Sequence, residues 1–275
     1  MPELPEVETI ARGLARRVTG DEIESVWLGS KPEPLKSSPQ EIVSALENTR
    51  IEKVRRWGKH IVFNLQHRGS APTDDPRQWV VHLGMTGRML IADPETAIEK
   101  HTHAIAKLKS GRELRFVDPR RFGRLSVARA RQGFRGTGAE PLEISFPAFR
   151  DLFRNRKTPI KSALLNQKLL QGIGNIYADE SLFRAGIKPR RQAAKLTDVE
   201  LKRLYDAIRQ VLRHAIKLGG SSVSDYVDAE GEKGFFQLRH RVYLRTGQPC
   251  LTCKTPIKRF LLGGRGTHFC PKCQK

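Results

Sequence analysis

The 275-residue sequence has few aromatic side chains, only four cysteines and no long apolar run. Aromatic residues make up 7% of the chain and hydrophobic residues 38%. No uninterrupted apolar stretch approaches the roughly 20 residues that a helix needs to cross a bilayer. We therefore expect about two domains plus one small module, without membrane-spanning helices.

Acidic residues are also scarce relative to basic ones. Lysine and arginine number 50 against 29 aspartates and glutamates, so the formal net charge at pH 7 is +21. Such an excess favours an anionic partner, which could be a phosphate backbone, ribosomal RNA or an anionic membrane surface. Because the sequence has no basic amphipathic helix and no lipidation signal, nucleic acid is the preferred partner and no membrane partner is expected.

The four cysteines lie in two close pairs. Cys250 and Cys253 form one Cys-x-x-Cys motif, Cys270 and Cys273 form another, and the 16 residues from 254 to 269 separate them. Four thiolates close a tetrahedral zinc site that has no position for water. Disulfides or a redox pair are alternatives, but the acidic N-terminus has no secretory-signal pattern, so we expect a cytoplasmic protein. The sequence predicts one structural Zn²⁺ and neither a catalytic metal nor an organic cofactor.

The first residues, Met1-Pro2-Glu3-Leu4-Pro5-Glu6, place a proline where removal of Met1 would create a free secondary amine. With a pKa near ~8, an α-amine is about a hundredfold richer in its neutral form at pH 7 than a lysine near ~10.4. Pro2 is therefore a candidate nucleophile, and the carboxyls of Glu3 and Glu6 could move protons. Alternatively, these residues simply begin an amphipathic helix, since proline and glutamate suit a first turn. The apolar pattern of that helix continues through Val7, Ile10, Ala11, Leu14 and Val18.

The organisation of the chain changes near residue 140. Before it, four short segments have β character, with a surface loop at 67–78, and they predict a β-sandwich or barrel. These segments are residues 61–65, 79–83, 104–109 and 113–117. After a glycine-bearing linker at 131–141, helical signals take over: Ser145 can cap a helix through Phe153, and Thr197 with Glu200 forms a capping box.

A glycine-rich turn, Gly172-Ile-Gly174-Asn175, enters a further helix that ends at Gly186. Backbone N–H groups at such a helix N-terminus can bind phosphate, and the Asn175 side chain can donate to the same group. A tight connection between two helices is the alternative interpretation of this turn.

Five motifs in order over the whole chain resemble bacterial formamidopyrimidine-DNA glycosylase. They are the opening Pro2 to Glu6, His82-Leu-Gly-Met85, Asp118-Pro-Arg-Arg-Phe-Gly123, Gly172 to Glu180, and the four cysteines. The resemblance implies an α+β multidomain fold. An N-terminal β-sandwich with a leading helix would span residues 1–135, a helical helix–two-turn–helix domain with a lesion-recognition loop 136–240, and a β-hairpin zinc finger 241–275.

The resemblance also implies an activity. The chain would be a monomeric base-excision repair enzyme that acts on double-stranded DNA containing oxidised purines or abasic sites. It would remove 8-oxoguanine and formamidopyrimidines through a Schiff base and cleave the strand by β,δ-elimination. Pro2 would be the nucleophile, Glu3 the proton donor and Glu6 a supporting carboxylate. Lys59 would serve β-elimination, although a solvated strand-edge lysine is the alternative, and Arg265 would serve δ-elimination.

Six further residues match DNA contacts of the family. Met85, Arg120 and Phe122 match the set that fills the gap left by an extruded base, although Met85 and Phe122 could be core residues. Phosphate contacts are implied for His101, Lys157 and Asn175.

Residues Ser221, Ser222 and Tyr226 belong to a segment that resembles the loop closing over the extruded purine. A disordered connector is the alternative for this segment. Two other activities stay open: an endonuclease VIII-type enzyme acting on oxidised pyrimidines, and a catalytically silent zinc-bearing DNA-binding protein. The Leu4-Pro5 opening and the lid segment argue against the former, and the presence of Pro2, Glu3, Lys59 and Arg265 against the latter.

Overall fold

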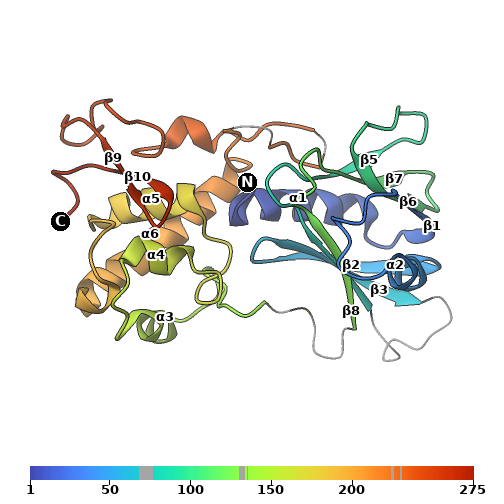
Figure 1. Ribbon diagram of the computed structural model, residues 1–275, viewed down its shortest axis with the longest axis horizontal. Helices are drawn as coiled ribbons and strands as arrows, with labels where there is room; N and C mark the ends of the chain where they lie inside the picture. Colours follow the sequence, from blue (N-terminus) through green and yellow to red (C-terminus); the bar gives the residue numbers. More distant parts are fainter. Residues whose placement is uncertain (68–76, 130–133, 135, 224–225, 230) are drawn as a thin grey trace. The chain divides into compact units, whose positions relative to one another are not determined.

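The computed structural model describes the chain except for residues 68–76, 130–133, 135, 224, 225 and 230. It contains two compact units (Figure 1). The first unit comprises Met1–Arg135 and Gly219–Gly234, and the second comprises Gly136–Leu218 and Phe235–Lys275. The chain therefore leaves the second unit at Gly219, contributes one segment to the first, and returns at Phe235. No helix in the described ranges combines the length and the apolar character needed to cross a membrane.

The first unit is built on one antiparallel sheet of eight strands, in the order β5-β7-β6-β1-β2-β3-β4-β8. The strands are β1 (Glu22–Leu28), β2 (Thr49–Trp57), β3 (His60–His67), β4 (Arg77–His82), β5 (Arg88–Ala92), β6 (Thr102–Leu108), β7 (Glu113–Val117) and β8 (Arg124–Arg129). Two helices, α1 (Leu4–Val18) and α2 (Pro39–Leu46), accompany the sheet. The four predicted strands match β3, β4, β6 and β7 within three residues at each end. Of the predicted loop 67–78, residues 68–76 lie outside the described residues.

The core of the first unit is formed between α1 and the sheet. The predicted apolar face of α1 is buried, and Ile10, Leu14 and Val18 share a cluster with Ile51 of β2 and Phe63 of β3. Burying each such side chain contributes about 1.5–3 kcal/mol. This packing holds the N-terminal end of the chain against the sheet, and the predicted amphipathic helix is confirmed.

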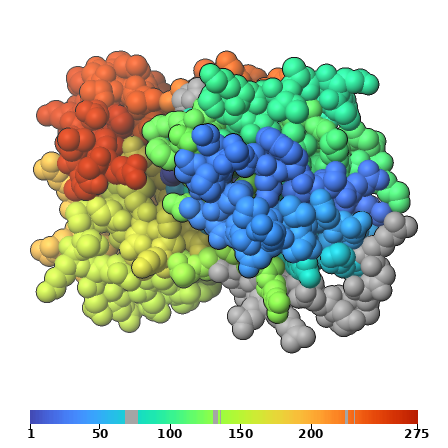
Figure 2. All heavy atoms as spheres, turned by 45° about the vertical axis from the view of Figure 1, so that its right-hand side comes forward, coloured from blue at the N-terminus to red at the C-terminus, as the bar shows by residue number. Residues whose placement is uncertain are grey.

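The second unit is helical, with a small hairpin at the end of the chain. Its helices are α3 (Phe146–Phe153), α4 (Ile160–Leu165), α5 (Asn175–Ala185) and α6 (Asp198–Lys217), with short turns η1 (Ala193–Lys195) and η2 (Phe236–Arg239), and its strands are β9 (Lys258–Leu262) and β10 (Arg265–Phe269). The predicted helix starts are confirmed, since the side chains of Ser145 and Thr197 accept the N–H of Ala148 and Glu200. Helix α5 ends at Gly186, whose φ of +71° is the left-handed conformation typical of a C-terminal glycine. The red atoms of the last residues lie directly on the yellow atoms of the helices in Figure 2.

The predicted α+β class is therefore confirmed, with a leading helix, a sheet, a helical region and a terminal hairpin. Part of the predicted linker 131–141 (131–133 and 135) lies outside the described residues. The division between the two units falls after Arg135.

Candidate active site and zinc module

The candidate nucleophile lies at the start of α1. Pro2 is buried and Glu3, the residue before the helix, is 3% exposed. The carboxylate of Glu6 lies in the first turn and makes two contacts: Oε2 accepts the Glu3 N–H at 2.8 Å, and Oε1 accepts the Ser221 N–H at 2.8 Å. The predicted helix start and the candidate site therefore consist of the same residues. The hydrogen bond from Ser221 to Glu6 connects them to the segment 219–234.

The predicted lesion-recognition residues lie where this segment meets α1. Gly220 has a φ of +82°, and a Cβ there would lie 2.9 Å from Glu6 Oε1, so only glycine fits the close approach. The Tyr226 hydroxyl donates to the carbonyls of Gly219 at 3.0 Å and Glu6 at 3.4 Å. The Ser222 hydroxyl donates to the Tyr226 carbonyl at 2.9 Å and accepts the Gly234 N–H at 2.9 Å. Ser221, Ser222 and Tyr226 are thus held by hydrogen bonds within the segment 219–234 and to Glu6.

Lys59 lies in the two-residue turn between β2 and β3, after Gly58, whose φ is +56°. Its 7% exposure shows that the alternative of a solvated strand-edge lysine is wrong. The turn is held to α1 through Arg56, which donates from Nε to Glu8 Oε2 at 2.7 Å and from Nη1 to the Gly58 carbonyl at 3.2 Å. Helix α1 therefore fixes both Pro2 and the turn that carries Lys59.

Two histidines beside Lys59 are kept neutral. The rings of His60 and His82 have centroids 4.9 Å apart. Burial, with the nearby charges of His60, Lys59 and Arg124, lowers the pKa of His82 to about 3, and burial also lowers the pKa of His60. Neutral His82 accepts the Gly84 N–H on Nδ1 at 3.1 Å, which fixes the turn leading to Met85. Its role in shaping this turn is a feature that sequence reasoning missed.

We call Met85, Arg120 and Phe122 the wedge residues, because they are predicted to fill the gap left by an extruded base. All three are exposed, on two adjacent turns. Met85 is 40% exposed and Phe122 is 51% exposed, so the alternative that they are core residues is wrong. The Arg120 guanidinium lies over the Phe122 ring, 4.8 Å from its centroid. The predicted phosphate contacts His101 and Lys157 also have exposed side chains.

A single buried carboxylate joins the two wedge-bearing turns. Asp118 is fully buried, and its Oδ1 accepts the Thr86 hydroxyl at 2.6 Å and the Arg120 N–H at 3.2 Å, while Oδ2 accepts the Gly123 N–H at 2.7 Å. The two turns also touch through their backbones, because a Cβ on Gly84 would lie 2.5 Å from the Gly123 nitrogen. Asp118 thus sets the spacing between Met85 and the Arg120–Phe122 pair.

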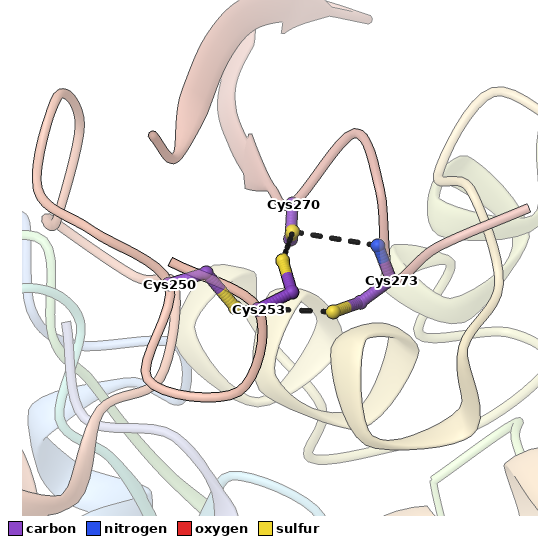
Figure 3. Close-up of side chains that lie close together, drawn as sticks. All are labelled: Cys250, Cys253, Cys270 and Cys273. Atoms are coloured by element: carbon purple, nitrogen blue, oxygen red, sulfur yellow. Dashed lines mark hydrogen bonds between the residues drawn. The ribbon is translucent and has the colours of Figure 1, made fainter. Parts of the chain in front are cut away.

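In the second unit, the four cysteines converge as predicted (Figure 3). Their sulfur atoms all lie within 4.8 Å of one another, with Cys253 Sγ 3.4 Å from Cys270 Sγ and Cys250 Sγ 3.9 Å from Cys273 Sγ. Four sulfurs about 2.3 Å from a tetrahedral zinc are about 3.8 Å apart, so the spacing fits this metal. Burial and the neighbouring sulfurs raise the pKa of Cys273, and a divalent cation would compensate four ionised thiolates. The cluster can hold one structural Zn²⁺.

Arg265 begins β10 directly after a tight turn. Gly263 and Gly264 have φ values of +54° and +72°, the pair of positive angles that a two-residue hairpin turn favours. Arg265 pairs with Leu262 across the hairpin, and its side chain is exposed. The guanidinium is therefore presented at the tip of the zinc module.

The strand after Arg265 is anchored by residues of α4 and α5. Asn175 donates from Nδ2 to the Gly266 carbonyl at 2.9 Å, so one of its amide hydrogens serves the hairpin rather than a phosphate. Lys161 is fully buried and binds the Gly266 carbonyl at 3.0 Å, the Thr267 hydroxyl at 2.9 Å and Asp179 at 2.7 Å. Asp179 also accepts the His268 N–H at 2.9 Å. Sequence reasoning missed Lys161 and Asp179 as supports of Arg265.

The fold and these sites define a two-unit α+β protein that carries a candidate amine nucleophile and an arginine-bearing zinc hairpin. Three family models cover most of the chain: the formamidopyrimidine-DNA glycosylase N-terminal domain matches residues 1–125, its H2TH domain matches 137–227, and a zinc finger found in FPG and IleRS matches 247–275. The chain belongs to the formamidopyrimidine-DNA glycosylase family.

Individual relatives are similar over their full length. Formamidopyrimidine-DNA glycosylase of Solibacter usitatus is 46% identical over 281 residues, with 100% of both chains covered. A mutant Lactococcus lactis FPG in complex with Fapy-dG-containing DNA is 34% identical, with a TM-score of 0.89 and 100% of both chains covered. Wild-type L. lactis FPG in complex with DNA containing an oxidised pyrimidine is 33% identical, with a TM-score of 0.88 and the same coverage.

Proposed function

We propose that this protein is a bifunctional DNA glycosylase and abasic-site lyase of base-excision repair that removes oxidised purines from duplex DNA. The observation that carries this function is full-length membership in the glycosylase family together with a proline at the start of α1. The structure of a relative with Fapy-dG-containing DNA supports oxidised purines as the substrate class. The net charge of +21 supports DNA as the partner.

The reaction begins once Met1 has been removed and the Pro2 nitrogen is a free amine. This nitrogen attacks C1′ of the damaged nucleotide, the C–N glycosidic bond breaks, and the base leaves with a proton. Glu3 donates the proton that opens the sugar ring and gives an iminium ion on Pro2. The iminium draws electrons from the neighbouring C–H bond, so loss of a C2′ proton expels the 3′ phosphate.

Lys59 serves this β-elimination from its buried turn, and Arg265 binds the phosphate that leaves in the following δ-elimination. Glu6 supports the site because its carboxylate accepts the backbone N–H groups of both Glu3 and Ser221 and so fixes their positions. The metal supplies no chemistry of its own when bound, because four thiolates complete its coordination and it acts through the hairpin that carries Arg265.

Extrusion of the damaged base requires groups that replace it in the duplex. Met85 and Phe122 enter the gap, and Arg120 hydrogen-bonds the unpaired cytosine. His101, Lys157 and the N-terminal end of α5 at Asn175 contact phosphates. Ser221, Ser222 and Tyr226 form the base of the loop that closes over the extruded purine.

The three functions map to residues 1–135 for catalysis, 136–240 for helical DNA binding and lesion recognition, and 241–275 for the zinc finger. The protein acts as a monomer. Its relatives are bacterial enzymes, so its DNA substrate and its site of action are in the cytoplasm.

Borohydride trapping tests the proposal directly. Wild-type protein incubated with borohydride and 8-oxoguanine duplex should form a covalent adduct whose mass maps to the Pro2 peptide, and Pro2→Gly should strongly reduce this adduct while retaining DNA binding. A matched duplex with an oxidised pyrimidine tests whether oxidised pyrimidines are also substrates. The L. lactis relative has been solved in complex with DNA that contains such a base. Faster trapping on the pyrimidine duplex would reverse the substrate assignment, and absence of any adduct with the Met1-free protein would refute the mechanism.

A further inference from the structure

A hollow of about 700 Å³ lies in the second unit, and its lining includes none of the residues assigned above to DNA. Its walls come from the C-terminal end of α5, one side of α6, residues 236–241 and the edge of the zinc module at Leu251 and Cys273. No function has been given to these surfaces in the glycosylase mechanism.

The hollow is lined by uncompensated positive charge. Arg184, Arg203, Arg239 and Arg241 line it with exposed side chains, and none of them has an ion-pair partner among the residues that the structure describes. The one carboxylate in the described lining is Glu180, which is 3% exposed. It accepts the N–H groups of Arg241, Val242 and Tyr243 at 2.9–3.0 Å, so backbone donors already engage it. Arg184 donates from Nε to the neutral amide of Gln210 at 2.8 Å, which does not compensate its charge. An incoming anion therefore meets guanidinium groups without a carboxylate partner.

The lining also has apolar side chains. Val211 and Phe236 are buried and contribute to its walls, with 6% and 3% exposure. Leu238 and Leu251 are 76% and 48% exposed, which is unusual for leucines grouped in one concave site. The lining therefore suits a ligand that is both anionic and apolar.

The hollow is at the opposite end of α5 from the hairpin tip. The first residue of α5, Asn175, bonds the strand that begins with Arg265, whereas the lining residues Phe183 to Gly186 come at the end of the helix. At 1.5 Å per residue, about nine residues along the helix separate these positions by roughly 13 Å. A ligand in the hollow can therefore bind without taking the place of DNA at Asn175 or Arg265.

We propose that this hollow binds a short acidic segment of a partner protein, with a bulky apolar side chain of that segment inserted between Leu238 and Leu251. Acidic side chains pair with the surrounding arginines, while the apolar side chain fills the space beside Phe236. Duplex DNA fits less well, because it offers phosphates along a convex backbone but no apolar side chain to enter a concave site. The binding would recruit the glycosylase to other proteins without changing its reaction.

The full-length, zinc-loaded protein should bind a fluorescein-labelled peptide, Asp-Asp-Glu-Asp-Leu-Phe, in a saturable way by fluorescence anisotropy. Arg203→Ser should weaken binding about tenfold because it removes a charged hydrogen-bond partner. Arg213→Ser is the matched control, since Arg213 is also exposed on α6 but does not line the hollow. Leu238→Ser should weaken binding of this peptide but not of a version in which Leu and Phe are replaced by Ser.

The same variants should excise 8-oxoguanine and bind lesion DNA at wild-type levels. Equal losses of peptide affinity in Arg203→Ser and Arg213→Ser would overturn the proposal, because the attraction would then follow net charge alone. A loss of DNA affinity in Arg203→Ser but not in Arg213→Ser would assign the hollow to DNA instead. Absence of saturable peptide binding up to about 1 mM, the weak end of specific affinities, would also refute it.

Discussion

The two units each present one proposed catalytic cation on a tight β-hairpin turn, but they support that turn in different ways. Lys59 follows Gly58 between β2 and β3, which lie inside the eight-stranded sheet. Arg265 follows Gly263 and Gly264 between β9 and β10, which form a sheet of only two strands. A two-stranded hairpin is at best marginally stable by itself in water, so the second turn needs support that the first obtains from its neighbouring strands.

The support of the Arg265 hairpin comes from a metal cluster and a buried ion pair. The cysteines close one end of the hairpin, and Lys161 with Asp179 holds β10 against the helices. By contrast, the Lys59 turn is held by Arg56 and Glu8, which attach it to α1. The comparison indicates that the two residues proposed for the eliminations lie on separately stabilised turns. Damage to the Arg265 hairpin should therefore leave the earlier β-elimination intact.

Loss of zinc should have the largest effect and should fall on the second unit. Cys270→Ser should remove the metal and unfold the hairpin, because structural zinc contributes on the order of 10 kcal/mol to the folding of such modules. DNA affinity and δ-elimination should both be lost, while the first unit keeps its folded sheet. Metal content by mass spectrometry, circular dichroism and a denaturing gel of cleaved 3′ ends measure these effects. The control is Lys272→Ser, which changes an exposed residue between Cys270 and Cys273 without removing a thiolate. A zinc-free Cys270→Ser protein with normal δ-product would separate the metal from the position of Arg265.

Removing the buried ion pair should be the next largest effect. Lys161→Met leaves Asp179 buried without its cation and should cost about 3–5 kcal/mol of unfolding free energy, measured by urea denaturation. The proportion of β- to δ-product should rise because β10 loses its anchor next to Arg265. Lys157→Met, at an exposed position four residues earlier in the chain, should change stability by less than about 0.5 kcal/mol.

A double variant sharpens the result. Lys161→Met with Asp179→Asn removes both charges and should recover part of the lost stability, since an unpaired buried charge no longer remains. If Lys161→Met changed neither stability nor the product ratio, the hairpin would depend on zinc alone.

Sequence signals identified the parts of the molecule whose structure follows from local chemistry. The amphipathic pattern of α1, the capping residue Thr197 and the paired cysteines all act over a few residues, and each prediction is confirmed. By contrast, β1 and β2 carry charged side chains between their apolar ones and were missed. The main partner of β1 is β6, about 80 residues further along the chain, so no local pattern indicates that pairing.

The candidate site divides in the same way. Motif residues such as Met85 and Phe122 could be singled out from sequence, but their exposure depends on two turns that meet through Asp118 and Gly84. Lys161 and Asp179 gave no signal, because a lysine 18 residues from an aspartate becomes an ion pair only when α4 packs beside α5. Contacts between distant segments therefore account for what the sequence did not predict.

A smaller effect is expected from changing Asp118, which joins the two turns that carry the wedge residues. Asp118→Asn keeps the side-chain shape but replaces one acceptor oxygen by a donor that would face the Gly123 N–H or the Thr86 hydroxyl. We expect a cost of about 1–3 kcal/mol in stability and weaker discrimination of the base opposite 8-oxoguanine. Excision rates with C, A, G and T opposite the lesion measure this discrimination. Cleavage of a preformed abasic site should change less, because no base has to be extruded. Unchanged opposite-base preference would show that Asp118 does not position Arg120.

Mild acid should have the smallest effect on the unfolding free energy. It should separate the contribution of His82, beside Lys59 in the first unit, from that of the zinc hairpin. The pKa of His82 is about 3 in the folded protein and near 6.5 when unfolded, so between these values the unfolded chain binds more protons. His82 therefore stabilises the fold above pH 6.5, and this contribution is lost as the pH falls toward 3. Between pH 6.5 and 5.5 the loss should be about 1 kcal/mol.

His82→Gln separates this effect from acid loss of zinc, which both proteins share. Glutamine retains an acceptor for the Gly84 N–H but cannot become charged, so its unfolding free energy should fall less over this pH range. Urea denaturation of both proteins at pH 6.5 and 5.5, with excess zinc, gives the difference. Parallel losses in the two proteins would mean that His82 does not titrate in this way and that groups common to both proteins, such as buried His60 and the zinc thiolates, account for the acid sensitivity.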